Sequence, residues 1–128
     1  MDQLLHGSLG LCLSKLQPKK VRQRYGLAHT PIIWVTFKEN ENTVSPKDID
    51  AMESAILDIL REVDRPVVFI DCFNEIRLAN GFNKAINWLE GIKKTCWERD
   101  CTLLISVNPQ MFEDRELAMI ERGTEEKE

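Results

Sequence analysis

The chain has 128 residues, of which 43% are hydrophobic and 30% are charged, and its formal net charge is -4. This balance is typical of one globular domain and excludes an intrinsically disordered chain. No apolar run approaches the roughly 20 residues that a membrane-spanning helix needs, and the first residues lack the basic start and cleavage signal of a secreted protein. We therefore expect a cytoplasmic protein that does not contact a membrane.

Charge is unevenly distributed along the sequence. Between Gln3 and Lys38 there is no Asp or Glu, and the basic residues there are Lys15, Lys19, Lys20, Arg22, Arg24 and Lys38. A basic N-terminal third in an acidic protein can form a surface that faces an anion, but it can also be a solvated helix face. Few aromatic residues accompany these bases, so we do not expect nucleic-acid binding.

The four cysteines are Cys12, Cys72, Cys96 and Cys101. They contain no Cys-x-x-Cys pair and have no histidine at zinc-site spacing, so we predict no metal site. Cys12 and Cys72 lie in apolar runs and are predicted to be small core residues. Cys96 and Cys101 flank a predicted helix-to-strand turn and could come close enough to oxidise, although we expect free thiols in a reducing compartment.

The first elements in chain order are a strand, a helix and a second strand. A short apolar run over residues 9–13 predicts the first strand. Pro18 then starts a helix, since proline at the first helical position loses no needed donor, and Gly26 ends it. Residues 31–37 are rich in β-branched and aromatic side chains and predict a second buried strand.

A polar loop is predicted over residues 38–43, and a helix follows it. Ser45 and Asp48, with proline between them, form a predicted capping box in which Ser45 is the N-cap. Apolar residues then recur at a spacing of three and four from residue 49 to 63, which indicates a helix with one face in the core.

The second half of the chain repeats this alternation. Residues 67–70 predict a strand buried on both faces, which ends at Asp71. A long polar loop is predicted over 72–80, after which Asn80 caps a helix with an apolar stripe to residue 96.

A last strand over residues 101–107 and a short helix over 113–122 complete the predicted elements, and Gly123 caps that helix. The alternation predicts a three-layer α/β/α domain with a mainly parallel four-stranded sheet. We expect one such domain over residues 1–123, followed by a frayed acidic tail over 124–128.

Polar residues follow each predicted strand. In open α/β sheets ligands bind outside the carboxyl ends of the strands, so these residues form the predicted site. The candidate ligand-binding residues at or near this edge are Lys15, Lys19, Lys20, Thr36, Asp71, Glu75 and Asn108.

Asp71 is the most informative of these residues. A carboxylate after an apolar strand is where a nucleotide hydrolase holds magnesium, but that chemistry also needs a glycine-rich phosphate cradle. Residues 14–20 contain no glycine, and Pro18 removes one amide donor. The alternative for Asp71 is a structural acid that accepts backbone N–H groups. Cys72 would be a nucleophile only if folding brought His29 to it. We therefore predict no catalytic residue and no cofactor.

Seven short motifs between about residues 10 and 122 resemble an archaeal family, the domain of unknown function 835. The motifs are Leu13-Ser14-Lys15 before Pro18, Tyr25-Gly26-Leu27, Thr30-Pro31 with Ile33-Trp34, Val44-Ser45-Pro46 with Asp48, Val67-Val68-Phe69-Ile70-Asp71, Asn80-Gly81-Phe82, and Val107-Asn108-Pro109 with Glu116-Leu117-Ala118. Together they cover nearly the whole chain.

The resemblance implies a reduced relative of the RecA and KaiC type of ATPase core, which has lost the phosphate-binding loop and occurs in archaeal signal-transduction proteins. It also implies the sheet order 1-4-3-2 for the four predicted strands. The alternative is 2-1-3-4, as in flavodoxin-like receivers. A receiver needs acids after its first strand, where this chain has Ser14 and Lys15, so we do not expect phosphorylation of Asp71.

These observations support two functional hypotheses. The first is a non-catalytic regulatory or protein-interaction module whose partner is another protein or a second copy of the chain, as in a homodimer. The second is a nucleotide- or anion-binding sensor, in which Lys15, Lys19 and Lys20 face phosphate near Asp71. The lost phosphate loop makes the second hypothesis the weaker one.

Overall fold

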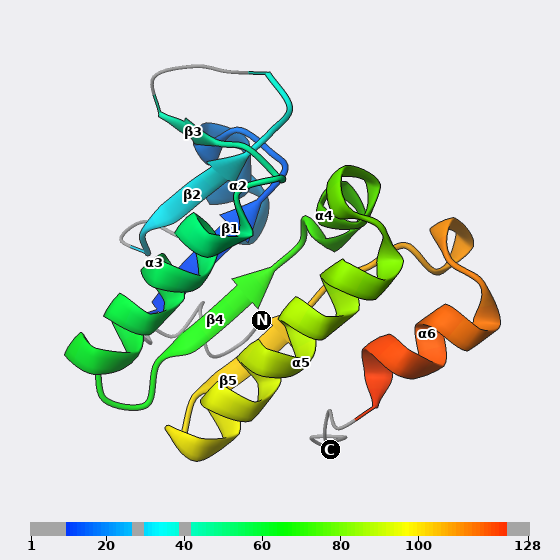
Figure 1. Cartoon of the computed structure of the whole chain (residues 1–128). Helices are drawn as coiled ribbons and strands as arrows, with labels where there is room; N and C mark the ends of the chain where they lie inside the picture. The colour runs from blue at the N-terminus through cyan, green and yellow to red at the C-terminus, as the bar shows by residue number, and fades with distance from the viewer. Residues whose placement is uncertain (1–9, 27–29, 39–41, 123–128) are drawn as a thin grey trace.

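The computed structural model describes residues 10–26, 30–38 and 42–122, and its centre is a five-stranded parallel sheet (Figure 1). The strands are β1 (Gly10–Ser14), β2 (Ile32–Val35), β3 (Thr43–Val44), β4 (Val67–Ile70) and β5 (Thr102–Ile105). The helices are α2 (Pro18–Tyr25), α3 (Ile49–Glu62), α4 (Phe73–Asn80), α5 (Phe82–Glu98) and α6 (Asp114–Glu121), with a 3-10 turn η1 (Pro109–Met111) before α6.

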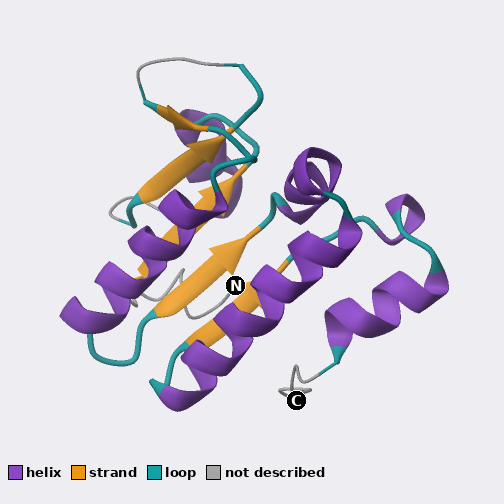
Figure 2. Cartoon of the chain, viewed as in Figure 1, coloured by secondary structure: helices purple, strands orange, loops and turns teal. Residues whose placement is uncertain are grey.

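Helices cover the two faces of the sheet unequally. Helices α3 and α5 lie side by side on one face, and α2 lies on the other (Figure 2). The mixed α/β fold with a parallel sheet is therefore confirmed. No helix within the described ranges is long and apolar enough to span a membrane.

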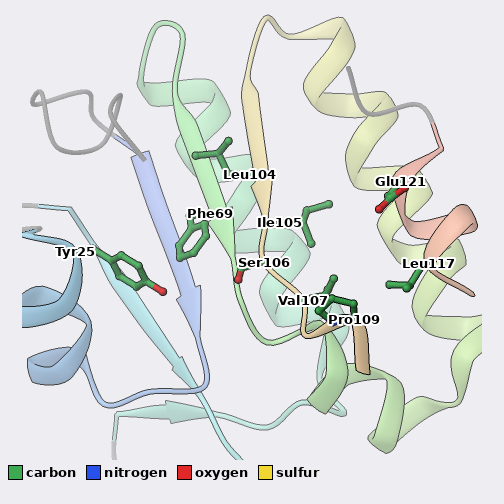
Figure 3. A pocket seen from close by; sticks show the side chains of 9 residues that line it. All are labelled: Tyr25, Phe69, Leu104, Ile105, Ser106, Val107, Pro109, Leu117 and Glu121. Atoms are coloured by element: carbon green, nitrogen blue, oxygen red, sulfur yellow. The ribbon is translucent and has the colours of Figure 1, made fainter. Parts of the chain in front are cut away.

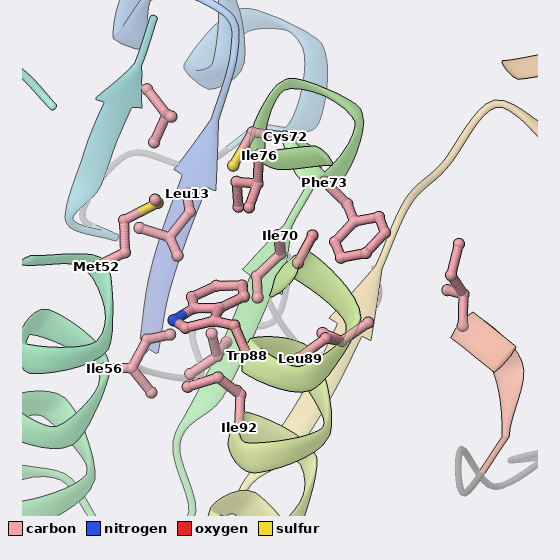
Figure 4. Close-up of a cluster of buried hydrophobic side chains, with 14 of the residues drawn as sticks. Leu13, Met52, Ile56, Ile70, Cys72, Phe73, Ile76, Trp88, Leu89 and Ile92 are labelled. Atoms are coloured by element: carbon pink, nitrogen blue, oxygen red, sulfur yellow. The ribbon is translucent and has the colours of Figure 1, made fainter. Parts of the chain in front are cut away.

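The larger core cluster lies under α3 and α5. Met52 and Ile56 from α3 and Leu89 from α5 meet Leu13 and Ile70 of the central strands, and all five side chains are fully buried (Figure 4). Each buried aliphatic side chain stabilises the fold by about 1.5–3 kcal/mol. The 3–4 apolar spacing in the sequence thus predicted this face of the fold correctly.

The strand order is β3-β2-β1-β4-β5, so the expected order 1-4-3-2 is wrong. In the numbering of the four predicted strands, the observed order is 2-1-3-4 with one additional edge strand. β1 lies between β2 and β4 in the middle of the sheet, and all five of its residues are buried. At Gly10, an added Cβ would lie 1.8 Å from the carbonyl oxygen of Val67, so glycine permits the close approach of β1 to β4. The fold therefore gives no support to a RecA- or KaiC-like core.

The additional strand β3 forms where the sequence predicted the end of a polar loop. Val44 O accepts a 3.0 Å hydrogen bond from Thr36 N, which joins β3 to the end of β2.

The predicted capping residue of α3 is wrong. Asp48 is the N-cap, and its Oδ1 accepts from Ala51 N at 3.1 Å, whereas Ser45 Oγ accepts from Lys47 N in the preceding turn.

The segment after Asp71 is a helix, α4, and not the predicted loop. Phe73 and Ile76, one turn apart, are both fully buried, and this pair gives the polar-looking segment an apolar side. Gly81 then separates α4 from α5 with a φ of 87°, a conformation that favours glycine. Asn80 does not cap the next helix. Its Nδ2 donates to Pro46 O and Ile76 O.

The predicted start and end of α2 and the predicted start of α6 are confirmed. α2 begins at Pro18 and ends before Gly26, which adopts the left-handed conformation with a φ of 69°. α6 begins after Glu113, whose backbone N–H donates a 2.9 Å hydrogen bond to Glu116 Oε1 in a capping box. The predicted cap Gly123 and the acidic tail lie outside the described residues.

Candidate functional site

Asp71 lies at the carboxyl end of β4 and is held by donors of its own chain. Its Oδ2 accepts a 2.9 Å hydrogen bond from Ser14 Oγ, and its Oδ1 accepts a 3.0 Å bond from Lys15 N. Ser14 Oγ in turn accepts from Leu16 N at 3.0 Å. We call these four residues the Asp71 corner. Asp71 is 6% exposed, so its carboxylate ties β4 to the loop after β1 from a buried position.

The Asp71 corner uses the amides that a phosphate cradle would need. A phosphate loop presents successive free N–H groups to the anion. Here Lys15 N and Leu16 N already donate to Asp71 and Ser14, and Pro18 has no N–H. This geometry favours the structural interpretation of Asp71, in which the acid caps a loop.

Two buried thiols lie near the Asp71 corner. Burial raises the pKa of Cys12 to about 12, and the negative charge of Asp71 adds to this effect while Arg22 opposes it. Burial also raises the pKa of Cys72 far above its ordinary value, with further contributions from Asp71 and Glu75. Both side chains are 0% exposed, which confirms them as core residues. A neutral, buried Cys72 is not a nucleophile, and His29 lies outside the described residues.

The other predicted site residues do not join this corner through any bond among the described residues. Thr36 Oγ1 accepts from Lys38 N at 3.3 Å, and Asn108 Oδ1 accepts from Gln110 N at 3.0 Å, so both organise their own turns. Lys15, Lys19 and Lys20 are exposed. The candidates are therefore spread along the carboxyl edge of the sheet.

Glu75 lies in the first turn of α4. Its Oε1 is buried without a hydrogen-bond partner. On the same helix, Arg77 Nη2 donates to Asn74 Oδ1 at 2.5 Å, and its guanidinium lies 4.7 Å from the centre of the Phe112 ring. Arg77 thus packs α4 against Phe112, which lies between η1 and α6.

A groove runs beside β5 and was not predicted from the sequence. It encloses about 520 Å³, and its lining residues are Tyr25, Phe69, Leu104, Ile105, Ser106, Val107, Pro109, Leu117 and Glu121. We call it the β5 groove. Figure 3 shows Tyr25 and Phe69 on one side of β5 and Leu117 of α6 on the other.

The β5 groove extends around the edge of the sheet. Leu104 packs in the smaller core cluster with Phe69 and Tyr25, whereas Ile105 packs in the larger cluster that includes Leu117. Alternate side chains of one strand therefore line the groove from both faces, as the two-residue period of a strand requires. All four residues of β5 are only half-buried. The apolar run of residues 102–105 indicated a strand, but the sequence could not show that this strand lies at the edge of the sheet.

The described residues contain no group of three or more His, Cys, Asp or Glu side chains placed to hold a metal ion. At the Asp71 corner the carboxylate faces hydroxyl and amide donors of the protein, which suits a structural contact. Within the described residues, the Asp71 corner offers hydrogen bonding and the β5 groove offers apolar contact.

Comparison with known proteins gives one match. No curated protein and no solved structure is significantly similar to this chain. The family model described as "Protein of unknown function (DUF835)" matches residues 1–123. Because the match covers nearly the whole chain, this protein belongs to the DUF835 family.

Proposed function

We propose that this protein is a non-catalytic protein-interaction module that pairs with a second copy of itself through the edge of β5. The observation that carries the proposal is the outer edge of β5, which no described strand covers. The Asp71 corner supports the non-catalytic part, since both carboxylate oxygens already accept hydrogen bonds from the chain.

The two edges of the sheet differ in how they are protected. At one edge, β3 has only two residues, and short strands are a common protection against unwanted pairing. At the other edge, β5 reads Thr-Leu-Leu-Ile and contains no charge and no proline. An apolar edge of this kind is a template for another strand unless something covers it.

Hydrogen-bond register identifies the groups that would pair. Thr102 N donates to Pro66 O at 3.0 Å, and Ser106 N donates to Ile70 O at 2.9 Å, both toward β4. Donors alternate along a strand, so the amides of Leu103 and Ile105 point away from β4. These amides and their carbonyls are the groups available to a second β5.

Two copies of β5 can pair antiparallel around a two-fold axis. In such an interface the same surface patch of each copy forms one side of the contact. A charged strand would therefore face an identical charged strand and be repelled by it. β5 carries no charge, and the β5 groove offers apolar side chains on both sides of the strand, with Glu121 as its one charged lining residue. A four-residue pairing is small, so we expect a weak dimer with a dissociation constant on the order of 10–100 µM.

Sedimentation velocity over a concentration series tests this proposal. The wild-type protein should change from monomer to dimer as its concentration rises to the order of 100 µM. Leu104→Lys places a charge in the β5 groove and should leave the protein monomeric. Leu78→Lys is the matched control, because Leu78 is a 63% exposed leucine on α4, away from the groove. A wild-type protein that stays monomeric throughout, or a Leu104→Lys variant that still dimerises, would contradict the proposal.

The alternative of a nucleotide- or anion-binding sensor has one favourable observation. α2 has no side-chain cap, has no acid in its first turn, and carries exposed Lys19 and Lys20. Calorimetric titration with ATP tests it. Heat of binding that disappears in a Lys19→Ala, Lys20→Ala double variant would favour the sensor, and metal-dependent ATP turnover that disappears in Asp71→Ala would contradict the non-catalytic module.

A further inference from the structure

Two cysteines meet at the turn between α5 and β5, at the opposite end of the sheet from the Asp71 corner. Cys101 N donates a 2.9 Å hydrogen bond to Cys96 O. Asp100, between them, has a φ of 58°, which turns the chain sharply. With standard bond lengths, this hydrogen bond limits the distance between the two Cα atoms to about 6.8 Å. That limit lies at the upper end of the Cα separation of disulfides, about 4.4–6.8 Å, so little movement is needed to join the two sulfurs.

The two thiols have unequal environments, and the Cys101 thiol also donates a 3.5 Å hydrogen bond to Thr102 O. Cys96 is 2% exposed, whereas Cys101 is only half-buried, and both belong to the larger core cluster. A hydrogen bond between the two side chains lowers the pKa of Cys101, assisted by a backbone hydrogen bond from Val68, although burial opposes the shift. The same contact, together with burial, raises the pKa of Cys96. Cys101 is thus the thiol of the pair with the lower pKa.

The other two cysteines provide an internal comparison. Cys12 and Cys72 are fully buried, and burial and nearby carboxylates raise the pKa of each. A thiolate is the reactive form of cysteine, and access to solvent is also required. Among the four thiols, Cys101 alone combines exposure with a lowered pKa and has a second thiol beside it.

We propose that Cys96 and Cys101 form a peroxide-reactive site, in which Cys101 is oxidised first and Cys96 converts the product to an intramolecular disulfide. The oxidant is hydrogen peroxide or a small organic hydroperoxide. This site would make the α5–β5 turn, which leads directly into β5, the redox-sensitive part of the chain.

The chemistry balances in two steps. The Cys101 thiolate attacks one peroxide oxygen, so that an S–O bond forms, the O–O bond breaks, and the leaving hydroxide takes up a proton as water. The Cys96 sulfur then attacks the sulfenic sulfur of Cys101, the S–S bond forms, and the S–O bond breaks. The departing hydroxide takes the Cys96 proton and leaves as a second water. The two sulfurs together lose two electrons as the disulfide forms, and one hydrogen peroxide gains these electrons and is reduced to two waters.

Mass spectrometry of the full chain tests this proposal. The reduced protein is treated with a small excess of hydrogen peroxide at pH 7, its free thiols are alkylated, and it is digested with trypsin. Trypsin cuts after Arg99, between the two cysteines, so a disulfide between them appears as two bridged peptides. We expect these bridged peptides and no oxidation of Cys12 or Cys72. Before oxidation, Cys101 should alkylate at least about tenfold faster than Cys12 or Cys72.

Two variants separate the roles of the thiols. In Cys96→Ala, the sulfenic acid of Cys101 has no resolving partner and should be trapped by dimedone. In Cys101→Ala, Cys96 should resist peroxide, and Cys101→Ser serves in its place if the alanine variant does not fold. Overturning results are oxidation of Cys101 at the rate of Cys12, peroxide treatment that yields no bridged peptides, or a Cys96→Ala variant that gives no dimedone adduct.

Discussion

The Asp71 corner and the β5 groove differ in what their polar and apolar groups contact. At the Asp71 corner a buried carboxylate meets Ser14 and Lys15 of the same chain, so its hydrogen-bonding capacity is used within the fold. At the β5 groove, the apolar side chains of β5 are only half-buried, and its outward amides face no other described strand. The comparison teaches that the conspicuous polar residue is used within the fold, while the plain apolar strand carries the proposed binding surface.

The largest expected effect is on stability at the Asp71 corner. Asp71→Ala would leave Ser14 Oγ and Lys15 N without their acceptor inside the protein. Removing one charged partner of buried hydrogen bonds costs about 3 kcal/mol of unfolding free energy. Urea denaturation measures this loss, and Asn108→Ala, at an exposed turn residue, is the control that should change stability by under about 1 kcal/mol. Equal stability of wild type and Asp71→Ala would show that the corner is not structural.

Alkaline pH provides a second test of the same region. The pKa of Cys12 is about 12 in the folded protein against an ordinary value of 9.0, so its stabilising contribution is complete below pH 9 and is lost as the pH rises toward 12. The loss amounts to about 1.4 kcal/mol per pH unit above 9. Denaturation curves from pH 8 to about 11 should therefore fall less steeply for Cys12→Ala than for wild type. Parallel curves for wild type and Cys12→Ala would contradict this prediction.

Helix α6 forms one wall of the β5 groove, and Lys93 of α5 holds the end of this helix. Its Nζ donates to Ile120 O and Arg122 O at the end of α6 and approaches Glu90 at 3.7 Å. Lys93→Met keeps the aliphatic stem but removes the donors, and we expect a loss of about 1–2 kcal/mol. Limited proteolysis should then cut near the end of α6 before the rest of the chain unfolds. Lys84→Met, at an exposed lysine of α5, is the matched control. Unchanged proteolysis of Lys93→Met would show that other contacts hold α6.

The smallest expected stability effect is at the β5 groove. Leu104 is half-buried, so Leu104→Lys should lower the unfolding free energy of the monomer by about 1 kcal/mol or less. The same substitution should prevent pairing, which separates binding from stability. Denaturation at a concentration far below dimer formation provides the measurement. A loss as large as that of Asp71→Ala would mean that Leu104 belongs to the core and not to a binding surface.

Much of the fold was predictable because local patterns determine it. The 3–4 spacing of Met52 and Ile56, the proline at the start of α2 and the four apolar residues of β4 each predict an element that is present. The helix α4 was missed because its apolar side depends on only Phe73 and Ile76, while the residues between them are polar. Asp71 was correctly located at the end of β4, and its structural role was one of the two interpretations that the sequence left open.

Strand order and edge position were not predictable from local pattern. An apolar run such as that of β5 indicates a buried strand. Which strands lie next to it in the sheet depends on long-range packing, which the run does not show. Only the contact between Gly10 and Val67 shows why β1 lies beside β4. The β5 groove follows from that order, so no motif in the sequence could have identified it.

Hydrogen exchange at the amides of Leu103 and Ile105 tests the central claim most directly. In the monomer these amides face outward from the sheet, whereas those of Thr102 and Ser106 are bonded to β4. We predict that Leu103 and Ile105 exchange rapidly at low protein concentration and become protected at high concentration, while Thr102 and Ser106 are protected at both. Exchange at Leu103 and Ile105 that does not depend on protein concentration would contradict pairing through β5.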